Sequence, residues 1–153
     1  MELHVLSDRQ LGSVAEWQQA IDAEGFPLRL TRSVDLLTIN GFLPVQLRET
    51  ETGFECFQDD EGQTMNFLGR DNFDQHRQFA FGIRWGSGSA ELLAVWMAAT
   101  AYAIATGGII FDHEEGKTFT KEQARETVQG MLREAPRVES IIGELKQKFT
   151  TQS

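Results

Sequence analysis

The longest uncharged run in the chain extends from Leu92 to Phe111, twenty residues without an acidic or basic side chain. A run of this length is long enough to cross a bilayer if it forms one helix. Gly107-Gly108 is expected to end that helix, so its apolar part from Ala90 to Ala105 spans only about 24 Å at 1.5 Å per residue, short of the roughly 30 Å hydrocarbon core. The run is rich in Ala and Thr, and its flanking charges are acidic, with no nearby cluster of Lys or Arg. We therefore predict a helix near residues 90–106 that is buried in the core of a soluble protein, with no membrane partner.

A buried helix needs other elements to cover it, and strand patterns supply them. Short apolar or alternating segments predict four strands, near residues 42–48, 54–58, 78–85 and 109–111. Residues 49–53 are expected to form a hairpin turn between the first two strands, because Gly53 suits a four- or five-residue loop. Shorter strands are indicated around Leu3 and Val5, where we expect a sheet edge, and at residues 27–31 and 117–119.

Two flanking helices begin with the spacing of a capping box, in which a Ser or Thr precedes a Glu or Gln by three residues. The pairs are Ser13 with Glu16 and Thr120 with Gln123. A last helix is expected after Pro136. Taken together, these elements predict one α+β domain over residues 1–153: a mainly antiparallel sheet packed against a buried central helix, with flanking N- and C-terminal helices.

Composition limits the partners of this domain. The chain carries 23 acidic residues against 14 Lys and Arg, a formal net charge of −9, which argues against nucleic acid and anionic membranes but allows a basic protein. The single cysteine, Cys56, permits no disulfide within the chain, so a reducing, cytoplasmic location is expected. The first eight residues lack the basic and apolar regions of a secretory signal.

Most of the negative charge lies between residues 49 and 74, where eight acidic residues are offset by Arg70 alone. One interpretation is a solvated hairpin and loop whose charge maintains solubility and prevents edge-to-edge pairing. Another is a surface that steers a basic protein toward the chain. A calcium loop is less favoured, because the acids lack its alternating ligand spacing. The partner-binding candidates are Glu49, Glu51, Asp59, Asp60, Glu61, Asp71 and Asp74.

The segment Asp112–Glu115, which contains His113, is the densest cluster of potential metal ligands. Adjacent side chains point in different directions, and the i, i+4 spacing of helical metal ligands is absent. The other histidines, His4 and His76, are remote in sequence and can join the cluster only through folding. The sequence therefore predicts a turn with solvated charges, and no metal or cofactor is assigned.

A second ligand candidate is the Gly- and Ser-rich turn at residues 86–89, which leads into the long helix and can present backbone N–H groups to an anion. Its candidate residues, with the histidine of the later turn, are Ser87, Gly88, Ser89 and His113. An ordinary strand-to-helix turn with Ser89 as the N-cap is the alternative, because Glu91 would repel a phosphate and no phosphate-binding lysine follows. Cys56 lies inside a predicted strand, so we expect an inert core residue and assign no catalytic residue.

Two stretches, Ala98–Asp112 and Gly116–Ala124, together resemble a pattern in small uncharacterised bacterial proteins, some of them of the toxin-immunity type. The pattern consists of an Ala-rich helix, a Gly-Gly turn, a short strand and a capped helix, and it covers 24 of the 153 residues. The resemblance implies a non-enzymatic bacterial cytoplasmic domain whose exposed surface is the functional part.

Two classes of function follow. The preferred hypothesis is a non-enzymatic protein-binding or immunity-like module that engages a basic partner through residues 49–74. The alternative is a small-molecule-binding protein or enzyme with a pocket near Gly86–Ser89 and Asp112-His113. Ionisable groups that converge in an apolar cleft would favour the alternative, and a convex acidic surface would favour the first. The sequence leaves open whether the aromatic residues line a pocket or fill the core, and it does not determine the oligomeric state.

Overall fold

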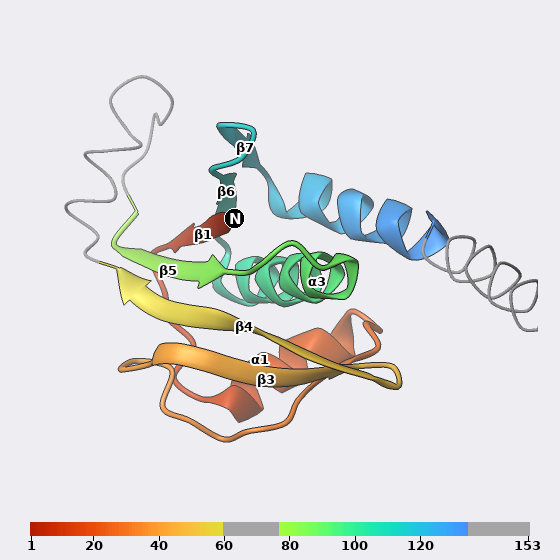
Figure 1. Ribbon diagram of the computed structural model, residues 1–153. Helices are drawn as coiled ribbons and strands as arrows, with labels where there is room; N and C mark the ends of the chain where they lie inside the picture. The colour runs from red at the N-terminus through yellow and green to blue at the C-terminus, as the bar shows by residue number, and fades with distance from the viewer. Residues whose placement is uncertain (60–76, 135–153) are drawn as a thin grey trace, which may run out of the picture.

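The computed structural model describes residues 1–59 and 77–134 (Figure 1). Seven strands form one sheet in the order β2-β3-β4-β5-β1-β6-β7, and all neighbouring pairs are antiparallel. The strands are β1 (Glu2–Ser7), β2 (Leu28–Leu30), β3 (Asn40–Leu47), β4 (Thr50–Asp59), β5 (Phe79–Arg84), β6 (Ile109–Asp112) and β7 (Lys117–Phe119). The sheet curls around a central helix, which confirms the predicted α+β class.

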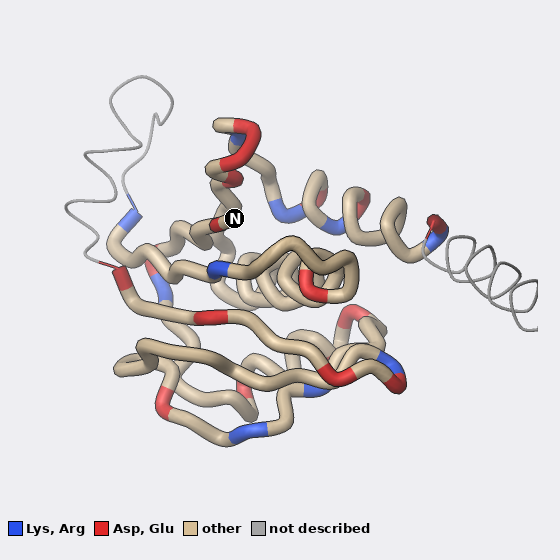
Figure 2. Tube along the Cα trace, in the orientation of Figure 1, with Lys and Arg blue, Asp and Glu red and all other residues tan. Residues whose placement is uncertain are grey.

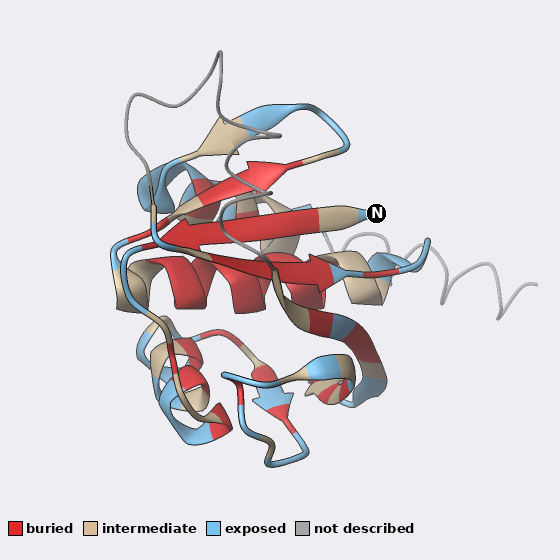
Figure 3. Cartoon of the chain, turned by 90° about the vertical axis from the view of Figure 1, so that its left-hand side faces the viewer, coloured by how far each residue is buried: buried red, intermediate tan, exposed pale blue. Residues whose placement is uncertain are grey.

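Three described helices lie on one face of the sheet: α1 (Val14–Ala23), α3 (Ser89–Thr106) and a helix at residues 121–134. Their apolar side chains form one core cluster with the inward-facing strand residues, including Trp17, Val128 and Leu3. Figure 3 shows this core as the buried, neighbouring strands β1 and β5 with the buried part of α3 behind them.

The burial of helix α3 explains why the run from Leu92 to Phe111 contains no charged residue. Every residue from Leu93 to Ala103 is buried, because the sheet covers one side of the helix and α1 packs on another. Five of these eleven residues are alanines, whose small side chains allow close approach of the neighbouring elements. By length and composition alone the helix could cross a membrane, but 61% of it is buried inside the fold.

The predicted glycine stop at the end of α3 is confirmed. Gly107 adopts the left-handed conformation with φ of 70°, and the Gly108 N–H donates to the Ala103 carbonyl at 2.8 Å, the bond that closes a Schellman motif. A Cβ atom on Gly108 would lie 2.6 Å from the Leu6 carbonyl oxygen. Gly108 is therefore required for the chain to leave α3 and pair β6 directly with β1.

An aromatic cluster joins α1, the sheet and α3. The ring of Phe81 stacks on Tyr102 with centroids 4.6 Å apart, and Trp17 meets both rings edge to face. The Trp17 indole N–H also donates to the Ala98 carbonyl at 2.9 Å, so its polar atom is satisfied inside the core. The sequence left open whether the aromatic residues line a pocket or fill the core, and these three rings fill the core.

The sequence located the elements well. All four predicted strands and the buried helix are present within a few residues of the expected positions, as are the shorter strands β2 and β7. Ser13 caps α1 by accepting from the Glu16 N–H at 3.2 Å. Thr120 and Gln123 form a reciprocal capping box with bonds of 3.0 and 3.1 Å. The helix predicted after Pro136 lies outside the described residues.

Two local predictions are wrong. The strand around Leu3 and Val5 is not at an edge but lies between β5 and β6, because both of its sides find partners that come later in the chain. The hairpin turn is not at residues 49–53 but at Arg48-Glu49, where Arg48 adopts a φ of 53°. Gly53 is inside β4, where the ring of Phe42 lies close enough that a Cβ atom would be 2.2 Å from it.

These contacts predict opposite effects for two Gly→Ala changes. Gly108→Ala places a methyl group against the Leu6 carbonyl, so we expect a loss of about 2 kcal/mol in the free energy of unfolding. Gly130→Ala, in the helix at 121–134, meets only the end of Arg133 at 4.0 Å and is expected to gain about 0.5–1 kcal/mol from helix propensity. Urea unfolding of both variants measures the difference, and equal stabilities would contradict the close approach of β6 to β1.

Candidate functional site

The second face of the sheet carries most of the polar chemistry, and no helix among the described residues packs on it. We call it the open face. Side chains alternate along a strand, so the burial of Leu3 and Val5 in the core turns Glu2 and His4 toward the open face. The strand register places further residues on the open face beside Glu2 and His4. They are Glu51, Glu55, Phe57 and Asp59 of β4, Arg84 of β5 and Phe111 of β6.

Two histidines meet on the open face. His4 Nδ1 lies 2.6 Å from His113 Nε2, and His4 Nε2 lies 2.8 Å from Asp59 Oδ2. Glu2 Oε2 is 3.8 Å from His113 Nε2. The four residues, which we call the histidine cluster, come from β1, the end of β4 and the residue after β6. His4 is only 3% exposed, whereas Glu2, Asp59 and His113 are partly exposed, so the cluster extends from a buried histidine to the protein surface.

Backbone pairing explains the meeting. Glu2 and His4 are two residues apart on β1 and therefore share a face. Leu3 pairs with Asp112 of β6, and the next backbone N–H, that of His113, donates to the Glu2 carbonyl at 3.2 Å. The histidine after β6 is thus held beside the start of β1 by the sheet itself.

The hydrogen bonds constrain the protons of the cluster. Asp59 as a carboxylate accepts from His4 Nε2–H, so a neutral His4 presents a lone pair at Nδ1, to which His113 donates from Nε2. Burial, and then the neighbouring His4, lower the pKa of His113 below its usual value of 6.5, and Glu2 opposes the shift. A neutral His113 at pH 7 agrees with this arrangement.

Aromatic rings and an arginine frame the cluster. Phe57 lies over Gly82, where a Cβ atom would come within 2.3 Å of two ring carbons, and its ring meets His4 edge to face at 5.8 Å. The Arg84 guanidinium carbon lies over the Phe57 ring, 5.0 Å from its centroid, and the guanidinium donates to Glu2 Oε1 at 2.8 Å. The absence of a side chain at Gly82 therefore determines how Phe57 packs beside His4.

The predicted acidic residues are only partly on this surface. Glu51 and Asp59 lie on the open face of β4 together with Glu55, at spacings of four residues, and Glu49 is in the hairpin turn. Figure 2 shows the acidic positions spread along β4 from the hairpin to its far end. Asp60, Glu61, Asp71 and Asp74 are outside the described residues.

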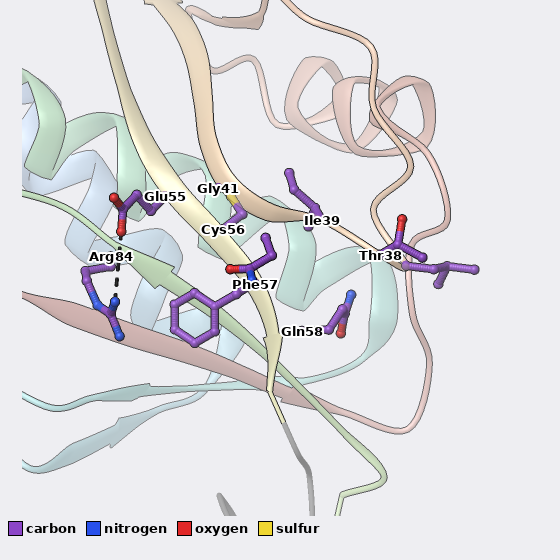
Figure 4. Close-up of a pocket in the computed structure, with 10 residues that line it drawn as sticks. Thr38, Ile39, Gly41, Glu55, Cys56, Phe57, Gln58 and Arg84 are labelled. Atoms are coloured by element: carbon purple, nitrogen blue, oxygen red, sulfur yellow. Dashed lines mark ion pairs between the residues drawn. The ribbon is translucent and has the colours of Figure 1, made fainter.

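A shallow groove of about 620 Å³ runs along the same part of the sheet (Figure 4). Its lining combines the ion pair of Glu55 and Arg84, 3.9 Å apart, with the ring of Phe57. Two large apolar side chains of this region are exposed to solvent: Leu37, which lines the groove, to 48%, and Phe42 to 58%. Phe42 pairs with Glu55 across the β3–β4 ladder.

The turn at residues 86–89 lacks the features expected of an anion-binding site. Gly88, not Ser89, is the N-cap of α3, and no side chain caps the helix there. The Glu91 carboxylate accepts from the Gly86 N–H at 2.8 Å, so an acid of the chain itself lies at this helix start. Gly86 lines a pocket with Trp85 and Glu91, and His113 is not part of that pocket. The turn and His113 therefore do not form one site there.

Two further ionisable residues are buried. Asp112 accepts from the Glu114 N–H at 2.9 Å, and burial, opposed by this bond, raises its pKa above 3.8. Cys56 is fully buried on the core side of β4, and burial raises the pKa of its thiol well above 9.0. These properties agree with the prediction of an inert cysteine.

Comparison with known proteins adds no relative. The chain matches no family model, no curated protein and no solved structure. Its function must therefore be inferred from its own surface.

Sequence reasoning missed the histidine cluster although it named His113 and His4. It tested the ligand spacing of a helix, whereas the relevant signal is Glu2-x-His4, two residues apart on a strand, which places both side chains on one face. The contribution of Asp59 and His113 depends on strand order, which a single sequence does not show.

The burial of Cys56 generates a prediction about its reactivity. A disulfide reagent should modify the native protein at least about 100-fold more slowly than the denatured chain, because the attacking thiolate is disfavoured and inaccessible. The rate is measured with a chromogenic disulfide at increasing urea, and the denatured protein, with its single thiol, provides the stoichiometric control. Rapid, complete reaction of the native protein would show that Cys56 is an accessible nucleophile.

Proposed function

We propose that the protein is a non-enzymatic, cytoplasmic binding module that engages a basic protein partner through the acidic part of the open face. The observation that carries the proposal is the placement of exposed Phe42 directly opposite Glu55, with Glu51 on the same face of β4. Interfaces commonly combine a central aromatic anchor with surrounding charges that guide and orient the partner.

The charge of this region supports a basic partner over an acidic or neutral one. Arg84, which pairs with Glu55 across the β4–β5 ladder, donates to Glu2 at 2.8 Å and lies 3.9 Å from the Glu55 carboxylate. The negative charge of Glu51 and of the turn residue Glu49 is exposed. Among residues 1–59 and 77–134, neither Glu49 nor Glu51 forms an ion pair, so a cationic side chain of a partner would gain electrostatic attraction there without displacing one of these.

The resemblance to small bacterial proteins of the toxin-immunity type supports the same class of function. A protein of that class acts by occupying the surface of its partner, so it needs no catalytic residue. A binding role agrees with the burial of Cys56, whose thiol pKa is raised. It also agrees with the pocket near the start of α3, which is lined by Gly86 but not by His113.

Neutralising the acidic face should slow association more than it changes dissociation. For the double variant Glu51→Gln/Glu55→Gln we expect the association rate with a Lys- and Arg-rich peptide that carries one Leu to fall about 3- to 10-fold at low salt, with a flatter salt dependence. The matched control is Glu122→Gln/Glu126→Gln, which removes the same charge from exposed positions on the helix at 121–134. Stopped-flow fluorescence measures both, and equal rates for the two double variants would exclude steering by β4.

The aromatic anchor generates a separate prediction. Phe42→Ala should accelerate dissociation of the same peptide about tenfold while the association rate changes little, because contact area is lost but charge is not. Stability should change by less than about 1 kcal/mol, since the ring is mostly exposed. Lys117→Ala, a change at an exposed position of β7 outside the proposed surface, is the control, and an unchanged dissociation rate of the Phe42 variant would remove the residue from the interface.

A further inference from the structure

The geometry points to a binding site for a divalent transition-metal ion of the zinc class, with Glu2, His4 and His113 as ligands. This site goes beyond the proposed function and does not depend on it. Two imidazole nitrogens and one carboxylate oxygen are a donor set that zinc and its neighbours in the first transition row accept, whereas magnesium and calcium prefer oxygen alone. One donor atom from each of the three residues lies within 4.8 Å of the others.

The distances fit an ion after a small adjustment. In a tetrahedral zinc site with metal–ligand bonds of about 2.0–2.1 Å, donor atoms are separated by about 3.3 Å. Glu2 Oε2 and His113 Nε2 are 3.8 Å apart, slightly more than this separation. His4 Nδ1 and His113 Nε2 are 2.6 Å apart and share a hydrogen bond. The two imidazoles therefore need to separate by roughly 0.7 Å, which rotation of the half-buried His113 ring can supply.

Asp59 already orients His4 as a ligand. Its carboxylate accepts from His4 Nε2–H at 2.8 Å, which leaves the lone pair of Nδ1 directed toward His113. Histidines that bind metals usually donate their second ring N–H to a carboxylate in this way, and the carboxylate fixes both the tautomer and the ring plane. For His113 to bind through Nε2, its proton moves to Nδ1, so the ion takes the place of the hydrogen bond between the rings.

The two carboxylate oxygens of Glu2 have different neighbours. It binds Oε1 at 2.8 Å, and Oε2 remains on the side of His113. The positive charge of Arg84 opposes a nearby cation, but Glu55 at 3.9 Å partly offsets it. Arg84 is therefore expected to position the Glu2 carboxylate at a modest cost in metal affinity.

The scaffold is rigid, and one side of the site is accessible. His4 lies on β1 between two paired strands and is almost fully buried, while the side chains of His113 and Glu2 are 22% and 26% exposed. An ion can therefore enter from the side of these two residues. Three protein ligands leave a fourth tetrahedral position for water or for an anionic group of a ligand.

The test uses the untagged full chain, treated with a chelator and titrated with Zn²⁺ by calorimetry and with Co²⁺ by visible absorption. We expect one ion per chain, a rise in melting temperature with Zn²⁺, and an intense Co²⁺ spectrum typical of four-coordinate nitrogen and oxygen ligands. His113→Gln should weaken Zn²⁺ binding at least 100-fold. Asp59→Asn, which removes a positioning residue but no ligand, should weaken it about 10- to 100-fold.

Glu115→Gln is the matched control, because it removes one exposed acid of the neighbouring turn and should leave the affinity unchanged. His4→Gln is buried and risks the fold, so His113→Gln, with circular dichroism to verify folding, carries the test. Nitrogen chemical shifts of the imidazoles in the wild-type chain provide a second measurement, in which His4 Nδ1 and His113 Nε2 should shift on addition of Zn²⁺. Absence of Zn²⁺ binding, or the same affinity for His113→Gln and wild type, would overturn the site.

Discussion

Burial of the central part of α3, from Leu93 to Ala103, is the constraint on which the rest of the structure depends. Eleven consecutive residues of the helix are shielded from water, so the sheet must curl around it and further helices must cover what the sheet does not reach. Burial of that apolar surface supplies the main driving force for folding. The aromatic cluster of Trp17, Phe81 and Tyr102 joins the layers and satisfies its own polar atoms, with Trp17 bonded to the helix backbone.

This arrangement separates the two faces of the sheet by chemistry. The face toward α3 is apolar, so the polar residues that alternate with it along β1 and β4 are directed to the opposite side. Because β1 occupies the interior of the sheet, its Glu2 and His4 meet residues from β4, β5 and the end of β6. An edge position for β1 would have given them neighbours on only one side.

The proposed partner surface and the proposed metal site share the open face and are linked by two residues. Arg84 contacts Glu2 of the histidine cluster and lies beside Glu55 of the acidic surface. Asp59 ends the acidic series on β4 and binds His4. An ion bound at the cluster would therefore alter the charge balance along β4, so metal occupancy and partner binding can influence each other through these two side chains.

Periodicity and turn chemistry in the sequence determined the elements: the uncharged helix, the glycine stop at Gly107-Gly108, the capping boxes and the strands near 42–48 and 78–85. These features depend on interactions within a few residues, so a single sequence contains them. The order of the strands was decided only by the tertiary structure, because pairing of β1 with β5 and β6 joins residues 72 to 109 positions apart. That long-range pairing, together with the alternation of side chains, brought His4, Asp59 and His113 into contact, and no local pattern in the sequence encodes such a meeting.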